Sequence, residues 1–184
     1  LASAGQYEEA HEAAIGIRRT SSMLNDLRLQ AEIDAVRGRF DEAVAHLREL
    51  RDQAAQLGFP GAAIEIAAAA ARLRFLAGDS ACTREVEDQL ARTPPNALPL
   101  MARPYLPLAY FYAVVGHPSV ARAWLARYER DVPTAWRGPD SWMRHRVLSA
   151  VLLAEGAPDA ALRELRAGER VVPVRVGMFD EPFV

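Results

Sequence analysis

Apolar residues recur along most of the chain with the spacing of an α-helix. After Ala121, for example, large apolar residues follow at Trp124, Leu125 and Tyr128, three, four and seven positions later. Positions with this spacing share one face of a helix, so each such run predicts a helix that packs on one side. The runs predict a trailing second helix over 7–19 and then four helix pairs: 23–37 with 40–57, 60–77 with 79–92, 104–115 with 118–131, and 140–155 with 158–170.

A short motif separates the two helices of each predicted pair. A glycine is followed two positions later by an aromatic residue or proline, and five positions later by alanine, with one weaker copy. The motif occurs at a nearly constant interval, at Gly5, Gly38, Gly78, Gly116 and Gly156. Glycine ends a helix because it adopts a positive φ without strain, and proline is accepted in the first turn of the next helix. The spacing therefore predicts a repeated helix–turn–helix unit.

Other residues recur at fixed distances from these glycines. A small residue lies seven positions before four of them, and these residues are Ala31, Ala71, Ala109 and Ser149. Small side chains let two helices approach closely. Prolines recur after three of the second helices, at Pro95, Pro133 and Pro173, where they prevent the helix from continuing. Three prolines also make 93–103 the longest predicted internal loop.

The pattern resembles the tetratricopeptide repeat family. The best copy consists of Tyr105, Leu108, Ala109, Tyr112, Gly116, Ala121, Leu125 and Pro133. Two earlier copies differ, because Asp34 and Arg74 replace the second aromatic residue. Three of the four intervals between the glycines are also longer than the family's period. The resemblance implies an all-α fold, a right-handed α-solenoid of antiparallel helix pairs, with a single array over 1–173 and an extended tail or linker over 174–184.

The resemblance also implies a binding surface. In this family the first helix of each pair lines a concave groove that commonly holds a peptide. The family's groove positions correspond here to Asn25, Arg28, Glu32, Glu65, Arg72, Phe75, Arg103, Tyr110 and Arg146, with apolar neighbours that include Val36, Leu76 and Leu153. Each first helix thus supplies one arginine. Because arginine forms paired hydrogen bonds with carboxylates, such a groove favours an acidic peptide.

Composition and charge narrow the classes of function. The formal net charge of −2 gives no basic field for nucleic acid or for an anionic membrane, and no apolar run is long enough to span a bilayer. All 22 positive residues are arginines, which is typical of a GC-rich bacterial source. The lone Cys82 rules out an intramolecular disulfide and fits a reducing compartment, so we expect a cytoplasmic protein.

The sequence carries no pattern typical of a catalytic, cofactor or metal site. His11, His46, His117 and His145 are scattered without a partner at ligand spacing. No glycine-rich phosphate loop or nucleophile elbow is present, and Cys82 has no obvious base. Acidic pairs such as Asp41 and Glu42 fall in first helical turns, where they stabilise the helix dipole. We therefore expect a protein that is not an enzyme.

These observations lead to one expected function and two alternatives. We expect a protein–protein interaction scaffold that binds a peptide or protein segment, and, because the chain starts at Leu1, a fragment of a larger bacterial signalling protein. The first alternative is a module of a transcriptional regulator that senses a small ligand. The second is a self-association module, in which the ends of the array or the tail pair with another copy.

Overall fold

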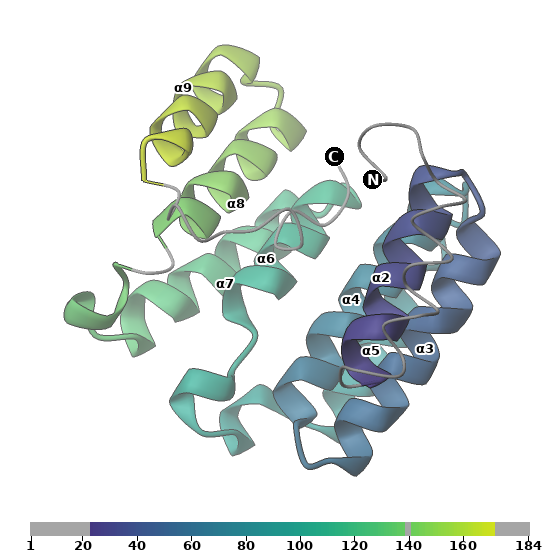
Figure 1. Ribbon diagram of the computed structural model, residues 1–184. Helices are drawn as coiled ribbons and strands as arrows, with labels where there is room; N and C mark the ends of the chain where they lie inside the picture. Colours follow the sequence, from purple (N-terminus) through teal and green to yellow (C-terminus); the bar gives the residue numbers. More distant parts are fainter. Residues whose placement is uncertain (1–22, 139–140, 172–184) are drawn as a thin grey trace. The chain divides into compact units, whose positions relative to one another are not determined.

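A computed structural model describes residues 23–138 and 141–171, and every regular element in these two ranges is a helix (Figure 1). The predicted helix over 7–19, the first turn motif at Gly5 and the tail over 174–184 lie outside the described residues. The chain separates into two compact units between Pro94 and Pro95, inside the predicted proline-rich loop. A single array over 1–173 therefore stays a prediction.

The first unit contains four described helices. They are α2 (Met23–Val36), α3 (Phe40–Gln56), α4 (Pro60–Leu76) and α5 (Thr83–Arg92). Extensive contacts join α2 to α3, α3 to α4 and α4 to α5, so each helix packs mainly on its neighbours in the sequence. Helix α3 therefore has a partner helix along two of its sides (Figure 1).

The described part of the second unit contains two helix pairs and three short 3₁₀ helices. Helices α6 (Tyr105–Val114) and α7 (Pro118–Asp131) form the first pair, and α8 (Ser141–Ala154) and α9 (Pro158–Glu169) form the second. The short helices are η2 (Pro95–Ala97), η3 (Leu100–Ala102) and η4 (Thr134–Trp136). Helix α6 packs against both α7 and α8, and α8 also contacts α7 and α9. The second unit thus differs from the first in the extensive contacts between its two first helices, α6 and α8.

The glycine turns have the predicted geometry. Gly38, Gly78, Gly116 and Gly156 have φ values from 76° to 92°. At each turn the amide after the glycine bonds to the carbonyl five residues earlier, as from Arg39 to Asp34 at 2.8 Å. This is the Schellman arrangement, which caps a helix with a residue in the left-handed region. The predicted ends of the first helices are therefore confirmed to within one residue.

A further turn of the same kind was missed in the sequence. Gly58 has φ 81°, and the amide of Phe59 bonds to the carbonyl of Ala54 at 2.9 Å. Pro60 and Ala63 stand two and five positions after Gly58, so the motif is the same as at the other glycines. This turn joins α3 to α4, between two predicted pairs. In the first unit a glycine turn of this kind therefore follows each of the single helices α2, α3 and α4.

Helix α5 begins later than predicted. The sequence pattern placed its start at residue 79, whereas the helix starts at Thr83. The carboxylate of Asp79 accepts a hydrogen bond from the amide of Ala81 at 2.8 Å, and this local bond stabilises a turn in place of a first helical turn. None of the described helices is long and apolar enough to cross a membrane.

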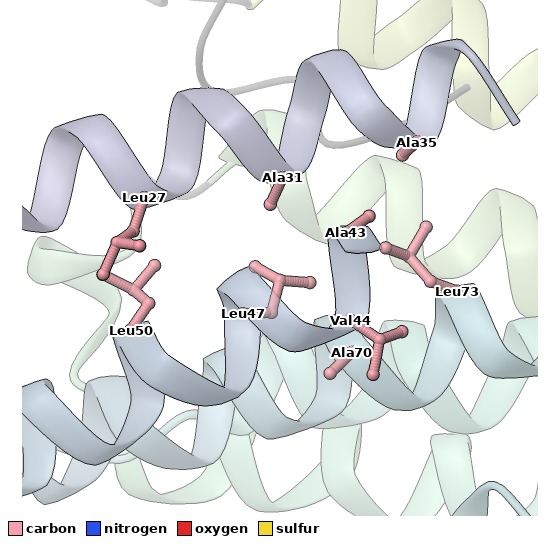
Figure 2. Close-up of a cluster of buried hydrophobic side chains, with 9 residues drawn as sticks. All are labelled: Leu27, Ala31, Ala35, Ala43, Val44, Leu47, Leu50, Ala70 and Leu73. Carbon is pink, nitrogen blue, oxygen red and sulfur yellow. The ribbon is translucent and has the colours of Figure 1, made fainter. Parts of the chain in front are cut away.

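Small residues dominate the core of the first unit. Figure 2 shows Leu27, Ala31 and Ala35 of α2 facing α3, with Ala70 and Leu73 of α4 also in the cluster. The α3 residues in this cluster are Ala43, Val44, Leu47 and Leu50. The predicted small positions Ala31 and Ala71 are fully buried. Alanines at such positions allow close helix contact, and they give α4 its alanine-rich sequence.

Aromatic residues fill the core of the second unit. Tyr105 and Trp124 lie with ring centroids 6.3 Å apart, and Phe111 meets Tyr112 edge to face at 5.0 Å. All four are buried, as is Ala109 at the predicted small position. Such rings bury a large apolar area on helices that meet several neighbours. These aromatic residues therefore form the core between the helices of the second unit.

Candidate functional site

The predicted groove residues of α2 lie close together. Arg28 donates a hydrogen bond from Nε to Glu32 Oε1 at 3.1 Å, one helical turn away. The Arg28 side chain is 43 % exposed and that of Glu32 is 16 % exposed. Asn25 belongs to the first turn of α2, but its side chain lies outside the described part of the chain. The α2 portion of the predicted surface is therefore an arginine whose charge is partly balanced by its own helix.

On α4 the predicted residues differ in exposure. Glu65 is exposed, Phe75 is 36 % exposed, and Arg72 is only 6 % exposed. A peptide lying on the outside of α4 would therefore meet Glu65 and Phe75 before it met Arg72. The idea of an arginine from every first helix fits α4 poorly, because sequence spacing cannot report how deeply a side chain lies.

Arg103 lies just before α6 and binds its own chain. Its guanidinium donates to the carbonyls of Leu98 at 2.9 Å and Asn96 at 3.3 Å, and to the hydroxyl of Tyr105 at 3.1 Å. Tyr105 in turn donates to Asp131 Oδ2 at 2.5 Å, at the end of α7. Burial, and then this hydrogen bond to Asp131, raise the pKa of Tyr105. Arg103 thus holds the loop before α6 in place. This role was not predicted from the sequence of the loop.

The structure brings two predicted groove residues together across a pair of helices. Arg146 of α8 lies over the ring of Tyr110 of α6, with its guanidinium carbon 4.9 Å from the ring centroid. The Arg146 side chain also donates to the Tyr110 hydroxyl at 3.4 Å. A cation over an aromatic face is attracted by the ring quadrupole. Both side chains are half-buried, so they join the first helices of the second unit while part of each stays accessible.

Large apolar side chains remain exposed in the last turn of three first helices. Val36 of α2, Phe75 and Leu76 of α4, and Leu153 of α8 are between 36 % and 63 % exposed. All stand two or three positions before a turn glycine, at places that the family resemblance assigns to the inner face. The second helix α3 has Ala55 and Gln56 at the same distance from Gly58. The exposed apolar residues thus fall at two adjacent repeat positions in three of the four described first helices, and α6 has the buried Ala113 and the half-buried Val114 there.

A group of charges around Glu85 of α5 was not predicted from the sequence. Arg48 donates to its two carboxylate oxygens at 3.2 and 2.8 Å, Arg51 at 2.7 Å and Arg74 at 3.2 Å. Burial alone raises the pKa of Glu85, but the hydrogen bonds and charges of Arg48, Arg51 and Arg74 outweigh it and hold the pKa below its usual value. The carboxylate joins α3, α4 and α5, and its role is in stability.

A sequence signal for part of this group was present. Arg74 stands where the family pattern has an aromatic residue, and it pairs with Asp79 across the glycine turn as well as with Glu85. Asp34, at the same position of α2, pairs with Arg39 across its own turn and lies 3.3 Å from His46. In both copies the residues four before and one after the glycine have opposite charges. This pattern could have been recognised in the sequence.

No group of three or more His, Cys, Asp or Glu side chains among the described residues could hold a metal ion. His46 and His145 each lie against one carboxylate, with His145 Nδ1 2.7 Å from Glu164 on α9. Burial raises the pKa of the Cys82 thiol, which makes it a weak nucleophile at neutral pH.

Comparison with known proteins adds no relative from which a role could be transferred. The chain matches no family model, no curated protein and no solved structure at a significant level. A role for this protein therefore has to be argued from its own geometry.

Proposed function

We propose that this protein is a non-enzymatic interaction scaffold, of the tetratricopeptide-like solenoid type, that binds an extended peptide or protein segment along its first helices. The observation that carries the proposal is the recurrence of exposed apolar residues in the last turns of α2, α4 and α8. Single exposed apolar residues are common and need no explanation. A set that repeats with the helix pairs, and falls on the face that the resemblance assigns to ligand binding, supports a shared role.

In the second unit this surface combines apolar and polar groups. Arg146 and Leu153 stand seven positions apart on α8, so they share one face of that helix, and Tyr110 of α6 contacts Arg146. An aromatic ring, a guanidinium and an exposed leucine together can bind an apolar side chain and a neighbouring carboxylate of a peptide. The ligand class is therefore a segment with alternating apolar and acidic residues.

The test is selection of binders from a phage-displayed library of random peptides, with the chain immobilised. Enriched peptides are then measured by titration against two variants, Leu76→Asp in the first unit and Leu153→Asp in the second. Each introduces a charge where an apolar side chain is exposed, so we expect helicity to be unchanged and affinity to fall about tenfold or more for peptides that use that unit.

The matched control is Leu57→Asp, at an exposed leucine of the α3–α4 turn outside the first helices. This variant keeps the affinity of the parent chain. The proposal is refuted if no peptide is enriched, or if enriched peptides bind Leu76→Asp and Leu153→Asp as tightly as they bind Leu57→Asp.

A further inference from the structure

Helix α9 exposes two leucines, Leu162 and Leu165, and the α7 counterpart of Leu165 is covered. Leu165 stands nine positions after Gly156, and Leu125 stands nine positions after Gly116. Leu125 is 5 % exposed because α7 packs against both α6 and α8, whereas Leu165 is 45 % exposed and the neighbouring Leu162 is 44 % exposed. On the equivalent helix of the preceding pair, the position of Leu165 is thus covered by other helices, whereas the position of Leu162 holds Arg122, which is exposed and pairs with Glu155.

We propose that a second copy of this chain covers the two leucines, with α9 packed antiparallel against the partner subunit's α9 around a twofold axis. Ala161 and Gly168 are buried and mark the face of α9 that packs on its own unit. Leu162 and Leu165 are three positions apart and lie together beside that face, on the exposed side of the helix. A twofold axis midway between the two leucines sets Leu162 opposite the Leu165 of the other copy. A symmetric interface of this kind is self-complementary by construction.

The charges beside the leucines fit this arrangement. Asp159 and Arg166 are seven positions apart, so they lie on the same flank of α9, and both are exposed. Neither forms an ion pair within the described residues. In an antiparallel twofold pair the same flank of each helix lies beside that flank of the other copy. The Asp159 of one copy is then offset from the Arg166 of the other by two residues, which is about 3 Å along the helix axis. Each dimer would therefore gain two ion pairs, which favour this register.

In this register a further charge, Glu169, lies near the start of the partner subunit's α9, one position from a like charge at Asp159. Glu169 is exposed and falls opposite Pro158 of the other copy, at the start of α9. A carboxylate near a helix N-terminus is stabilised by the unpaired amides and the helix dipole. The proposed interface is on a second helix, apart from the first-helix residues of the peptide-binding proposal. Its success or failure is therefore independent of that proposal.

The first experiment measures mass against concentration by sedimentation velocity. The parent chain is expected to shift from monomer toward dimer as concentration rises. Leu165→Asp is expected to raise the dimer dissociation constant at least about tenfold, since a charge would enter the apolar centre of the interface. Its helix content stays that of the parent, because the position is exposed. Leu57→Asp, which charges an exposed leucine on another turn, leaves the dimer unchanged.

The second experiment exchanges the flanking charges. Asp159→Arg and Arg166→Asp each place like charges together twice, so each variant alone dimerises about fivefold or more weakly. An equimolar mixture of the two restores attraction at both sites and forms the heterodimer at the parent affinity. A chain that is monomeric at every concentration, a dimer unaffected by Leu165→Asp, or a mixture no tighter than its components would each overturn the proposal.

Discussion

The two units close the same glycine turn with different side chains. At Gly38 and Gly78 of the first unit the residue four before the glycine and the residue one after it form ion pairs, Asp34 with Arg39 and Arg74 with Asp79, whereas Gly58 has Ala54 and Phe59 at these positions. In the second unit the same two positions around Gly116 hold the rings of Tyr112 and His117, with centroids 6.4 Å apart. The backbone bond across the turn is common to both. The same Schellman backbone turn is therefore compatible with an ion pair or with a pair of aromatic rings across it.

The cores differ in the same way. In the first unit, buried alanines let helices that follow one another in the sequence pack closely, with α3 in contact with both α2 and α4. In the second unit, aromatic rings are buried where α6 contacts α8 as well as α7. Buried alanines thus occur in the unit whose helices contact mainly their neighbours in the sequence, and buried aromatic rings in the unit where α6 also contacts α8.

The largest expected effect comes from emptying the aromatic core. Phe111 is 1 % exposed, and Phe111→Ala is expected to lower the free energy of unfolding by about 3–5 kcal/mol. Hydrogen exchange should show the loss of protection in α6, α7 and α8. The matched control is Phe75→Ala on α4, where the ring is partly exposed and the expected cost is less than about 1 kcal/mol. Equal losses in both variants would mean that burial does not separate the two phenylalanines.

Overfilling the alanine core is the reciprocal change in the first unit. Ala31 is fully buried between α2 and α3, as Figure 2 shows, and Ala31→Leu is expected to cost about 2 kcal/mol because the helices must separate. Urea unfolding followed by circular dichroism measures it. Ala45→Leu, at an exposed position of α3, is the control and should be close to neutral. A stable Ala31→Leu chain would contradict the close contact of α2 and α3.

Much of the fold could be predicted because it depends on local chemistry. Helical periodicity, turn glycines and prolines placed every α-helix of the described ranges, and only α5 begins more than one position from its predicted start. The turn at Gly58 was not predicted although it has the same motif, because the predicted period spans a whole helix pair. The division at Pro94 could not be predicted, since it depends on which helices touch across long separations, and spacing in the sequence contains no such information.

The candidate surface was less accessible to sequence analysis. The family pattern identifies one face of each helix. It correctly places Tyr110 and Arg146 near each other, since the two side chains are in contact. It could not foresee that Arg72 is buried, or that Arg103 is held by backbone carbonyls. Arginine side chains are long and their partners come from other elements, so position along a helix does not determine where the charge lies.

The Glu85 group tests whether ion pairs contribute in the first unit what rings contribute in the second. Glu85→Gln is expected to cost about 1–2 kcal/mol at neutral pH, less than a fully buried pair would, because Arg48 is 45 % exposed. The measurement is urea unfolding at a series of pH values. The control is Glu87→Gln, at an exposed position of the same helix, with an expected change near zero.

The pH dependence of this loss has a defined sign. The folded pKa of Glu85 lies below its unfolded value, so the carboxylate contributes its stability fully above the unfolded pKa, about pH 4.3. The contribution declines as the pH falls through the folded pKa, where both states become protonated. The gap between the parent chain and Glu85→Gln should therefore be constant near neutrality and narrow below about pH 4. A gap that widens in acid would exclude an ion-pair origin.

The smallest effect concerns the turn that both units share. Gly58 has φ 81°, and a Cβ there would meet nothing within 4 Å, so Gly58→Ala should cost only the backbone strain of the left-handed region, about 1 kcal/mol. Gly116→Ala in the second unit, at φ 84° and equally open, should cost the same. Gly138→Ala also has open space but no positive φ, and it should be neutral or slightly stabilising.

Thermal unfolding of these three variants decides whether the α3–α4 turn is equivalent to the turns within pairs. If Gly58→Ala and Gly116→Ala lose the same stability, the turn between pairs contributes as much as a turn within a pair. The single helix is then the repeated unit of the first unit. A loss that matches Gly138→Ala would instead restore the helix pair as the unit of repetition there, since the left-handed turn at Gly58 would then contribute nothing to stability.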